Sequence, residues 1–127
     1  MVRTLLVEDN AVLRGLIREM LRFRFPSMMI FEAGDGREAF QVIEERPPDL
    51  VLMDIRLPDE NGLSLTRRIK HRHPRTAIII LTSYDFPEYR EAASREGALH
   101  FVTKGDAGAD KLAEMIQSAF PDVSHPM

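Results

Sequence analysis

The chain lacks several features that would mark special classes of protein. It has no cysteine among its 127 residues, which excludes disulfides and thiolate metal sites. No apolar run approaches the roughly 18 residues that a membrane span needs, and the N-terminus lacks the order of a signal peptide. Neither sign of charge dominates, because the formal net charge is -3, so no basic surface for nucleic acid or anionic lipid is visible. We therefore expect a soluble cytoplasmic protein whose domain contacts neither membrane nor nucleic acid directly.

Short apolar runs alternate with longer amphipathic segments along the chain. With 127 residues, 44% of them hydrophobic, the chain is long enough for one domain with its own core. Two of the runs, 50–53 and 77–81, are almost entirely apolar, which is typical of parallel strands covered on both faces. The predicted strands are 3–7, 28–33, 50–53, 77–81 and 99–103.

The segments between these strands carry helical signals. A buried stripe at helical spacing is formed by Leu13, Leu16, Ile17, Met20 and Leu21. Capping residues, prolines and glycines bound the other predicted helices, which cover about 35–46, 62–71, 87–97 and 110–120.

Five strand–helix pairs in succession predict an α/β fold. Right-handed crossovers with helices on both faces give a doubly wound (βα)5, flavodoxin-like parallel sheet with strand order 2-1-3-4-5. In such a sheet, ligands bind beyond the carboxyl ends of the first and third strands. We expect one domain over residues 1–120, with 121–127 as a tail or the stump of a linker.

Polar residues follow four of the predicted strands. Glu8 and Asp9 follow the first strand and Asp54 follows the third. Thr82 follows the fourth strand and Lys104 the fifth. An aspartate after a strand is, taken alone, most often a turn residue. The joint arrangement is far more specific, because the carboxyl ends of parallel strands lie along one edge of a sheet.

This edge carries the groups needed to bind a divalent cation and transfer a phosphoryl group. Carboxylate oxygens are the ligands that Mg2+ prefers. Asp54 can attack a phosphoryl donor and form an acyl phosphate, while the cation spreads the developing charge. Lys104 would hold one phosphate oxygen and the hydroxyl of Thr82 another. The sequence therefore predicts a phosphoacceptor site with Mg2+ as its cofactor.

The chain resembles the response-regulator receiver domain of two-component signalling over essentially its whole length. The resemblance is carried by LLVEDN at 5–10, AGDGREA at 33–39, DLVLMDIRLP at 49–58, NGL at 61–63, ILTS at 80–83 and the stretch from Gly97-Ala98 to Lys104. Together these motifs are highly specific. They imply a phosphorylation-dependent switch that catalyses only its own phosphorylation and dephosphorylation, rather than an enzyme with a diffusible substrate.

The resemblance also implies roles for residues of the site. Asp54 would accept its phosphoryl group from a sensor histidine kinase or a phosphotransfer protein of a phosphorelay. Lys104 would be the base that senses the phosphate. Mg2+ would be bound by Glu8, Asp9, Asp54 and the backbone carbonyl of Arg56.

Thr82 and Phe101 would form the switch pair. When the phosphoryl group draws the Thr82 hydroxyl toward it, the Phe101 ring can turn into the vacated space. The surface of the fourth helix, fifth strand and fifth helix then repacks, which in this family can allow a homodimer on phosphorylation. The output would be control of transcription through a linked or partner module.

Some positions depart from the common family pattern. The segment from Thr103 to Ala107 has Gly105 where many members have proline, and it looks like the subfamily with LuxR-type helix-turn-helix output domains. Phe101 stands where tyrosine is frequent. Arg56 and Tyr84, each two residues after a site residue, would flank the phosphate, and their bulk would slow its hydrolysis.

Two rival functions share parts of this pattern. A phosphatase of the haloacid dehalogenase type also uses an aspartyl phosphate, but it needs a second aspartate two residues after the nucleophile, where Arg56 stands. A flavin-binding module is compatible with the topology, but the acidic turn at Glu8 and Asp9 would repel the flavin phosphate.

Overall fold

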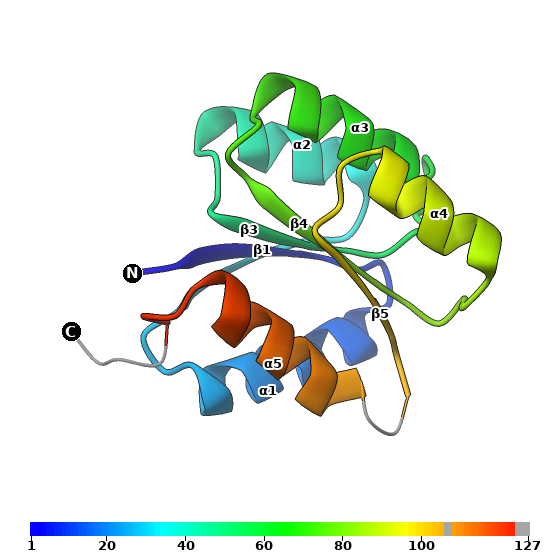
Figure 1. Ribbon diagram of the computed structural model, residues 1–127. Coiled ribbons are helices and arrows are strands. Elements are labelled where there is room, and N and C mark those ends of the chain that lie inside the picture. The colour runs from blue at the N-terminus through cyan, green and yellow to red at the C-terminus, as the bar shows by residue number, and fades with distance from the viewer. Residues whose placement is uncertain (106–107, 124–127) are drawn as a thin grey trace.

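The computed structural model describes residues 1–105 and 108–123. Within these residues, five parallel strands form one sheet in the order β2-β1-β3-β4-β5 (Figure 1). The strands are β1 (Arg3–Val7), β2 (Met29–Ala33), β3 (Leu50–Met53), β4 (Ala77–Thr82) and β5 (His100–Thr103). The helices are α1 (Ala11–Arg24), α2 (Gly36–Glu45), α3 (Gly62–Arg72), α4 (Pro87–Arg95) and α5 (Gly108–Ala119). The predicted doubly wound α/β fold and its strand order are confirmed.

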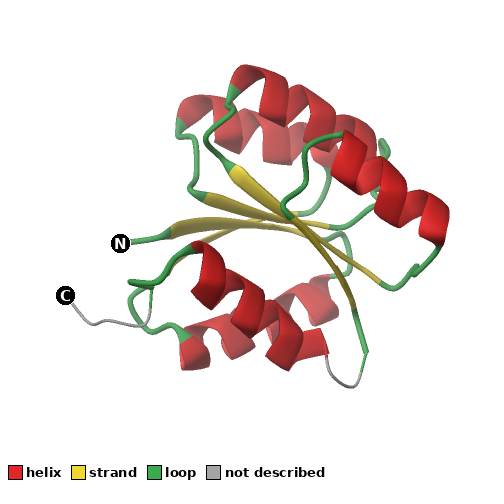
Figure 2. Ribbon diagram, viewed as in Figure 1, coloured by secondary structure: helices red, strands yellow, loops and turns green. Residues whose placement is uncertain are grey.

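The sheet lies between two layers of helices (Figure 2). Helices α1 and α5 cover one face, and α2, α3 and α4 cover the other. From β1 the chain moves outward to β2, whereas from β3 it moves outward in the opposite direction to β4 and β5. The reversal opens a crevice beyond the carboxyl ends of β1 and β3, where ligands of such sheets bind.

Each face of the sheet buries its own hydrophobic cluster. In β3, Val51 and Met53 pack toward α2, α3 and α4, while Leu50 and Leu52 pack toward α1 and α5. Successive side chains of a strand point to opposite faces, so a strand covered on both faces is apolar at every position. Polar groups are therefore confined to the point where the strand ends.

Polar side chains cap the N-termini of the three helices that follow β1, β2 and β3. The side chains of Asn10, Asp35 and Asn61 cap α1, α2 and α3 by accepting a backbone hydrogen bond at 3.0, 2.8 and 2.7 Å. A side-chain oxygen at this position satisfies an N–H group that has no partner inside the helix. These caps set where the chain leaves the sheet, and so shape the edge that carries the polar residues.

One residue of the predicted buried stripe in α1 is exposed. Leu16 is 65% exposed, whereas Ile17 and Leu21 are buried against the sheet and α5. Adjacent residues of a helix point about 100° apart, so only part of a wide apolar stripe can face the sheet.

The packed structure extends past residue 120. Val123 is only 3% exposed, and Ser27 Oγ donates a hydrogen bond to its carbonyl at 3.3 Å. Helix α5 begins at Gly108, two residues before the predicted start, and β4 includes Thr82. Residues 124–127 of the expected tail lie outside the described residues, as do Asp106 and Ala107 of the LuxR-like segment. In the part of the chain that is described, no helix has both the length and the apolar character to span a membrane.

Candidate functional site

Three carboxylates meet at the crevice between β1 and β3. One oxygen from each of Glu8, Asp9 and Asp54 lies within 4.8 Å of the others. The backbone of both strands continues to pair here: Glu8 N donates to Ala33 O at 3.0 Å. Asp54 N donates to Val7 O at 3.2 Å. Glu8 and Asp54 are buried and Asp9 is exposed, so the cluster opens to solvent on the side of Asp9.

Lys104 extends from the end of β5 across this cluster. Its Nζ donates to Asp54 Oδ2 at 3.0 Å and also forms a short hydrogen bond with Glu8 Oε1. Burial by itself would lower the pKa of the Lys104 ammonium, but its hydrogen bonds to the two carboxylates raise that pKa above the ordinary value. Burial raises the pKa of Glu8 despite these bonds. Lys104 therefore stays charged and offsets part of the negative charge of the cluster.

The donor set fits a hard divalent cation. Asp54 Oδ1 is buried and has no hydrogen-bond partner among the described residues, although its other oxygen is paired with Lys104. A buried carboxylate oxygen without a partner is costly and is satisfied by a cation or a donor from a ligand. Three carboxylates on one open edge suit Mg2+, which binds few protein oxygens and keeps several waters.

The loop after Asp54 places Arg56 at the rim of the site. Arg56 pairs with Asn61 in an isolated bridge, and its carbonyl accepts no hydrogen bond from the described residues. Its guanidinium carbon lies 4.1 Å from the centre of the Tyr84 ring. Arg56 and Tyr84, which were predicted from the sequence to flank a phosphate, are thus stacked on each other.

Gly62 allows α3 to begin against the backbone of Asp54. Its N–H donates to Ile55 O at 2.6 Å. A Cβ atom at this position would lie 2.0 Å from Asp54 O, so any side chain here would force the two backbone segments apart. The glycine after Asn61 therefore allows the close contact of α3 with the loop that follows β3.

Thr82 and Phe101 lie on the same face of the sheet. Phe101 is the register partner of Ile80, and Thr82 follows Ile80 by two positions, so all three point toward α4. The hydroxyl of Thr82 is buried and accepts a hydrogen bond from Tyr84 N at 3.3 Å. The guanidinium of Arg90 in α4 lies 4.6 Å from the Phe101 ring centre.

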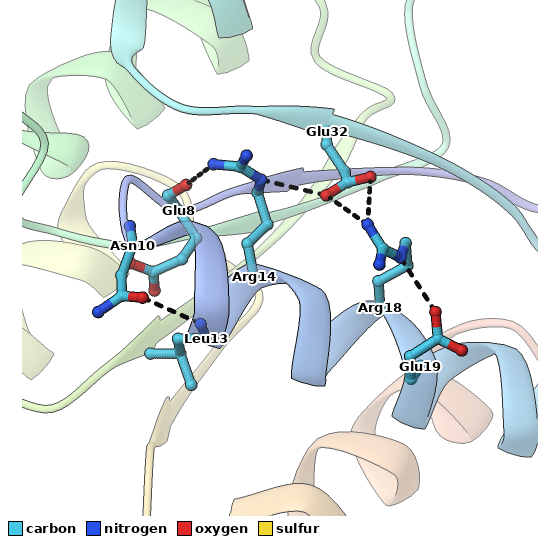
Figure 3. Close-up of polar contacts among 7 residues, drawn as sticks. All are labelled: Glu8, Asn10, Leu13, Arg14, Arg18, Glu19 and Glu32. Carbon is cyan, nitrogen blue, oxygen red and sulfur yellow. Dashed lines mark hydrogen bonds and ion pairs between the residues drawn. The ribbon is translucent and has the colours of Figure 1, made fainter.

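Sequence reasoning missed the residues that hold the turn between β1 and α1. Arg14 donates to Glu8 O at 2.8 Å, and its Nε donates to Glu32 Oε1 at 3.1 Å (Figure 3). Helical side chains lean toward the N-terminus, so a long residue four positions after the cap Asn10 covers the preceding turn. That spacing was the available signal for Arg14. The participation of Glu32, on the neighbouring strand, had no local signal.

Comparison with known proteins identifies the family of this chain. Residues 4–117 match the model of the response regulator receiver domain. The chain therefore belongs to the receiver domains of two-component response regulators, as its motifs indicated. In this family the acidic pocket at the sheet edge binds Mg2+.

Several response regulators are similar to this chain in sequence or in structure. The chain is 36% identical over 104 residues to the oxygen regulatory protein NreC of Staphylococcus haemolyticus, covering 81% of this chain and 48% of that protein. It is 33% identical over 118 residues to the response regulator GacA of Pseudomonas viridiflava, covering 93% and 53%. A LuxR-family two-component response regulator from Aurantimonas sp. SI85-9A1 superposes with a TM-score of 0.86 at 30% identity, covering 93% of this chain and 84% of that one. The chain spans about half the length of the curated relatives it matches.

Proposed function

We propose that Asp54 is the phosphoacceptor of a signalling switch, phosphorylated by a sensor histidine kinase or a phosphotransfer protein. The observation that carries this proposal is the cluster itself, in which one oxygen from each of three carboxylates lies within 4.8 Å of the others. Lys104 is bonded to Asp54, whose other oxygen has no partner in the described part of the chain. The donors for the cation are Glu8, Asp9, Asp54 and the backbone carbonyl of Arg56. Bound Mg2+ supplies positive charge that offsets the charge on the phosphoryl oxygens.

The roles of the side chains follow from their positions. An Asp54 oxygen attacks phosphorus and the bond from phosphorus to the donor breaks, so the phosphoryl group moves onto the carboxylate. Lys104 already lies 3.0 Å from Asp54 Oδ2 and shifts to a phosphoryl oxygen as that carboxylate charge is consumed. The hydroxyl of Thr82, at the end of β4, donates to another phosphoryl oxygen.

The response of the protein is a change in the surface made by α4, β5 and α5. The movement of Thr82 toward the phosphoryl group leaves space into which the Phe101 ring turns. A second packing of α4 against β5 is then favoured by contacts made only in the phosphorylated state. The relation to NreC and GacA, of which this chain spans about half, supports an output module that controls transcription, and phosphorylation promotes a homodimer through the changed surface.

The acceptor is tested with acetyl phosphate and Mg2+ by intact-mass measurement. Wild type should gain one phosphoryl group, and Asp54→Asn should gain none. Asp49→Asn, a change of carboxylate at the opposite end of β3, is the matched control and should label like wild type. Equal labelling of Asp54→Asn would place the acceptor elsewhere. Sustained release of phosphate from a general phosphomonoester would favour the phosphatase alternative.

A further inference from the structure

Within the described parts of the chain, no side-chain contact holds the carboxylate of Asp9, unlike those of Glu8 and Asp54. It is exposed, and its carboxylate makes no hydrogen bond or ion pair with any residue of 1–105 or 108–123. By contrast, Glu8 and Asp54 are both held by Lys104. The direction of the Asp9 side chain therefore depends on its backbone.

Arg14 holds the peptide group that precedes Asp9. Its Nη1 donates to Glu8 O at 2.8 Å, while its Nε donates to Glu32 Oε1 at 3.1 Å, as Figure 3 shows. Glu32 is itself held by Arg18 Nη1 at 3.0 Å. A Cβ at Gly34 would lie 3.4 Å from Arg14 Nη1, so the guanidinium lies against the end of β2.

A bond to Glu8 O constrains Asp9 for a geometric reason. The carbonyl of Glu8 and the N–H of Asp9 belong to the same planar peptide group. Glu8 O lies past the last ladder bond of β1, so Arg14 supplies a partner that the sheet does not. On the other side of the turn, Asn10 N donates to Glu8 Oε2 at 3.1 Å. The turn that carries Asp9 is thus fixed on both sides by named bonds.

We propose that Arg14 is a positioning residue, which holds the Glu8–Asp9 peptide so that the Asp9 carboxylate points into the cation site. This inference rests on the proposed function, because it concerns binding of Mg2+ by the acidic cluster. Arg14 belongs to α1, bonds the carbonyl of Glu8 at the end of β1 and is held in turn by Glu32 of β2. Residues of three elements therefore fix the position of this peptide group.

The charge of Arg14 and its proposed positioning role predict opposite changes in Mg2+ affinity when Arg14 is replaced. The direction of the measured change therefore tests the inference. A guanidinium near the cluster repels a divalent cation, so removal of its charge should tighten binding of Mg2+. If Arg14 instead positions Asp9, its removal should weaken binding. Arg18 is the matched control, because it shares the contact to Glu32 and the positive charge but makes no bond to Glu8.

The experiment compares wild type with Arg14→Gln, Arg14→Lys and Arg18→Gln. Calorimetric titration with Mg2+ gives the affinity, and hydrogen exchange without Mg2+ reports the turn itself. Both Arg14 variants should bind Mg2+ about tenfold more weakly, the lower end of the effect of losing a partner behind a metal ligand. Exchange should accelerate at the amides of Asn10 and Leu13, which are bonded within this turn. Arg18→Gln should leave both readouts at the wild-type level.

The outcomes separate this inference from the proposed function. Failure of wild type to bind Mg2+ would contradict the proposed function. Binding by wild type with unchanged or tighter binding by Arg14→Gln would overturn the positioning role alone. Equal loss in Arg14→Gln and Arg18→Gln would also overturn it, since the effect would then come from Glu32. Thermal unfolding checks each variant, and Arg14→Lys, which keeps the charge, provides the test if Arg14→Gln does not fold.

Discussion

Arg56 lies with its guanidinium carbon 4.1 Å from the centre of the Tyr84 ring, at the rim of the acidic cluster. The two residues follow Asp54 and Thr82 by two positions, so the stacked pair joins the loops after β3 and β4. We expect a pair held in this way to limit the approach of water to Asp54 more than either side chain would alone.

The first prediction is that this pair prolongs the life of the phosphoryl group. Arg56→Ala and Tyr84→Ala should each shorten its half-life about two- to fivefold, the rate equivalent of roughly 0.5–1 kcal/mol for a stacked cation and ring. The measurement is decay of phosphorylated protein after removal of the donor. Arg68→Ala is the matched control, because Arg68 also stacks on a ring, that of Phe40, at 4.8 Å. If the phosphoryl half-life is seconds and does not change when both Arg56 and Tyr84 are replaced by small residues, the pair does not shield the phosphoryl group from water.

The second prediction concerns Arg90, whose Nε donates to Asp85 Oδ1 at 2.5 Å. The guanidinium of Arg90 lies 4.6 Å from the ring centre of Phe101, the proposed switch residue. Turning of the ring would break this contact, so Arg90 stabilises the unphosphorylated arrangement. Arg90→Ala should tighten binding of beryllofluoride with Mg2+ about two- to fivefold, the equivalent of roughly 0.5–1 kcal/mol. Arg95→Ala removes another arginine of α4 and should have no effect. Weaker binding by Arg90→Ala would contradict the role.

The third prediction tests the contact between α3 and the loop of Asp54. Gly62→Ala places a Cβ 2.0 Å from Asp54 O and should lower the free energy of unfolding by roughly 1–3 kcal/mol. Urea unfolding measures this loss. Gly105→Ala is the control, because no atom of the described residues, apart from its chain neighbours, lies within 4 Å of its added Cβ. It should change stability by less than about 0.5 kcal/mol. Equal stability of the two variants would mean that α3 can move away from Asp54 without cost.

The fourth prediction is a pH dependence from Glu32. Burial alone would raise its pKa, but hydrogen bonds from Arg18 and Arg14 lower that pKa below the ordinary value of 4.5. The unfolded state therefore binds this proton more readily, so the stabilisation is present above about pH 4.5 and is lost as the pH falls through the lowered pKa.

Glu32→Gln mimics the protonated form and separates this effect from general acid unfolding. At pH 7 it should lower the free energy of unfolding by about 1 kcal/mol, a modest value because the pair is partly exposed. The difference from wild type should shrink in acid. Glu45→Gln changes a carboxylate with no bond to the described residues and should show no such trend. A difference independent of pH would contradict the assignment to the Glu32 carboxylate.

Much of the fold could be predicted from local patterns. The strands 3–7 and 50–53 were predicted with their observed ends. Residues 50–53 could be recognised because a strand buried on both faces is a continuous apolar run. The exposure of Leu16 could not be predicted, because periodicity marks the direction of an apolar stripe but not how much of it a neighbour covers. The burial of Val123 depends on contact with α1 and α5, which no local pattern reveals.

Part of the site could be predicted from the sequence because of the topology of the sheet. Parallel strands end at one edge, so the residues that follow them meet there, and Glu8, Asp9, Asp54 and Lys104 do so in the structure. From the sequence, Lys104 was predicted only to hold a phosphate oxygen. Its bonds to both Glu8 and Asp54, across 96 and 50 residues, became visible only in three dimensions.

By itself, the sequence determined the class of fold, the family and the identity of the polar residues at the sheet edge, because these depend on periodicity and on order along the chain. Only the tertiary structure decided how those residues are held. The unpaired oxygen of Asp54, the stacking of Arg56 on Tyr84 and the bond from Arg14 to Glu8 depend on distances between side chains of different elements. Such distances are set by packing of the helices on the sheet, which no single segment of the chain encodes.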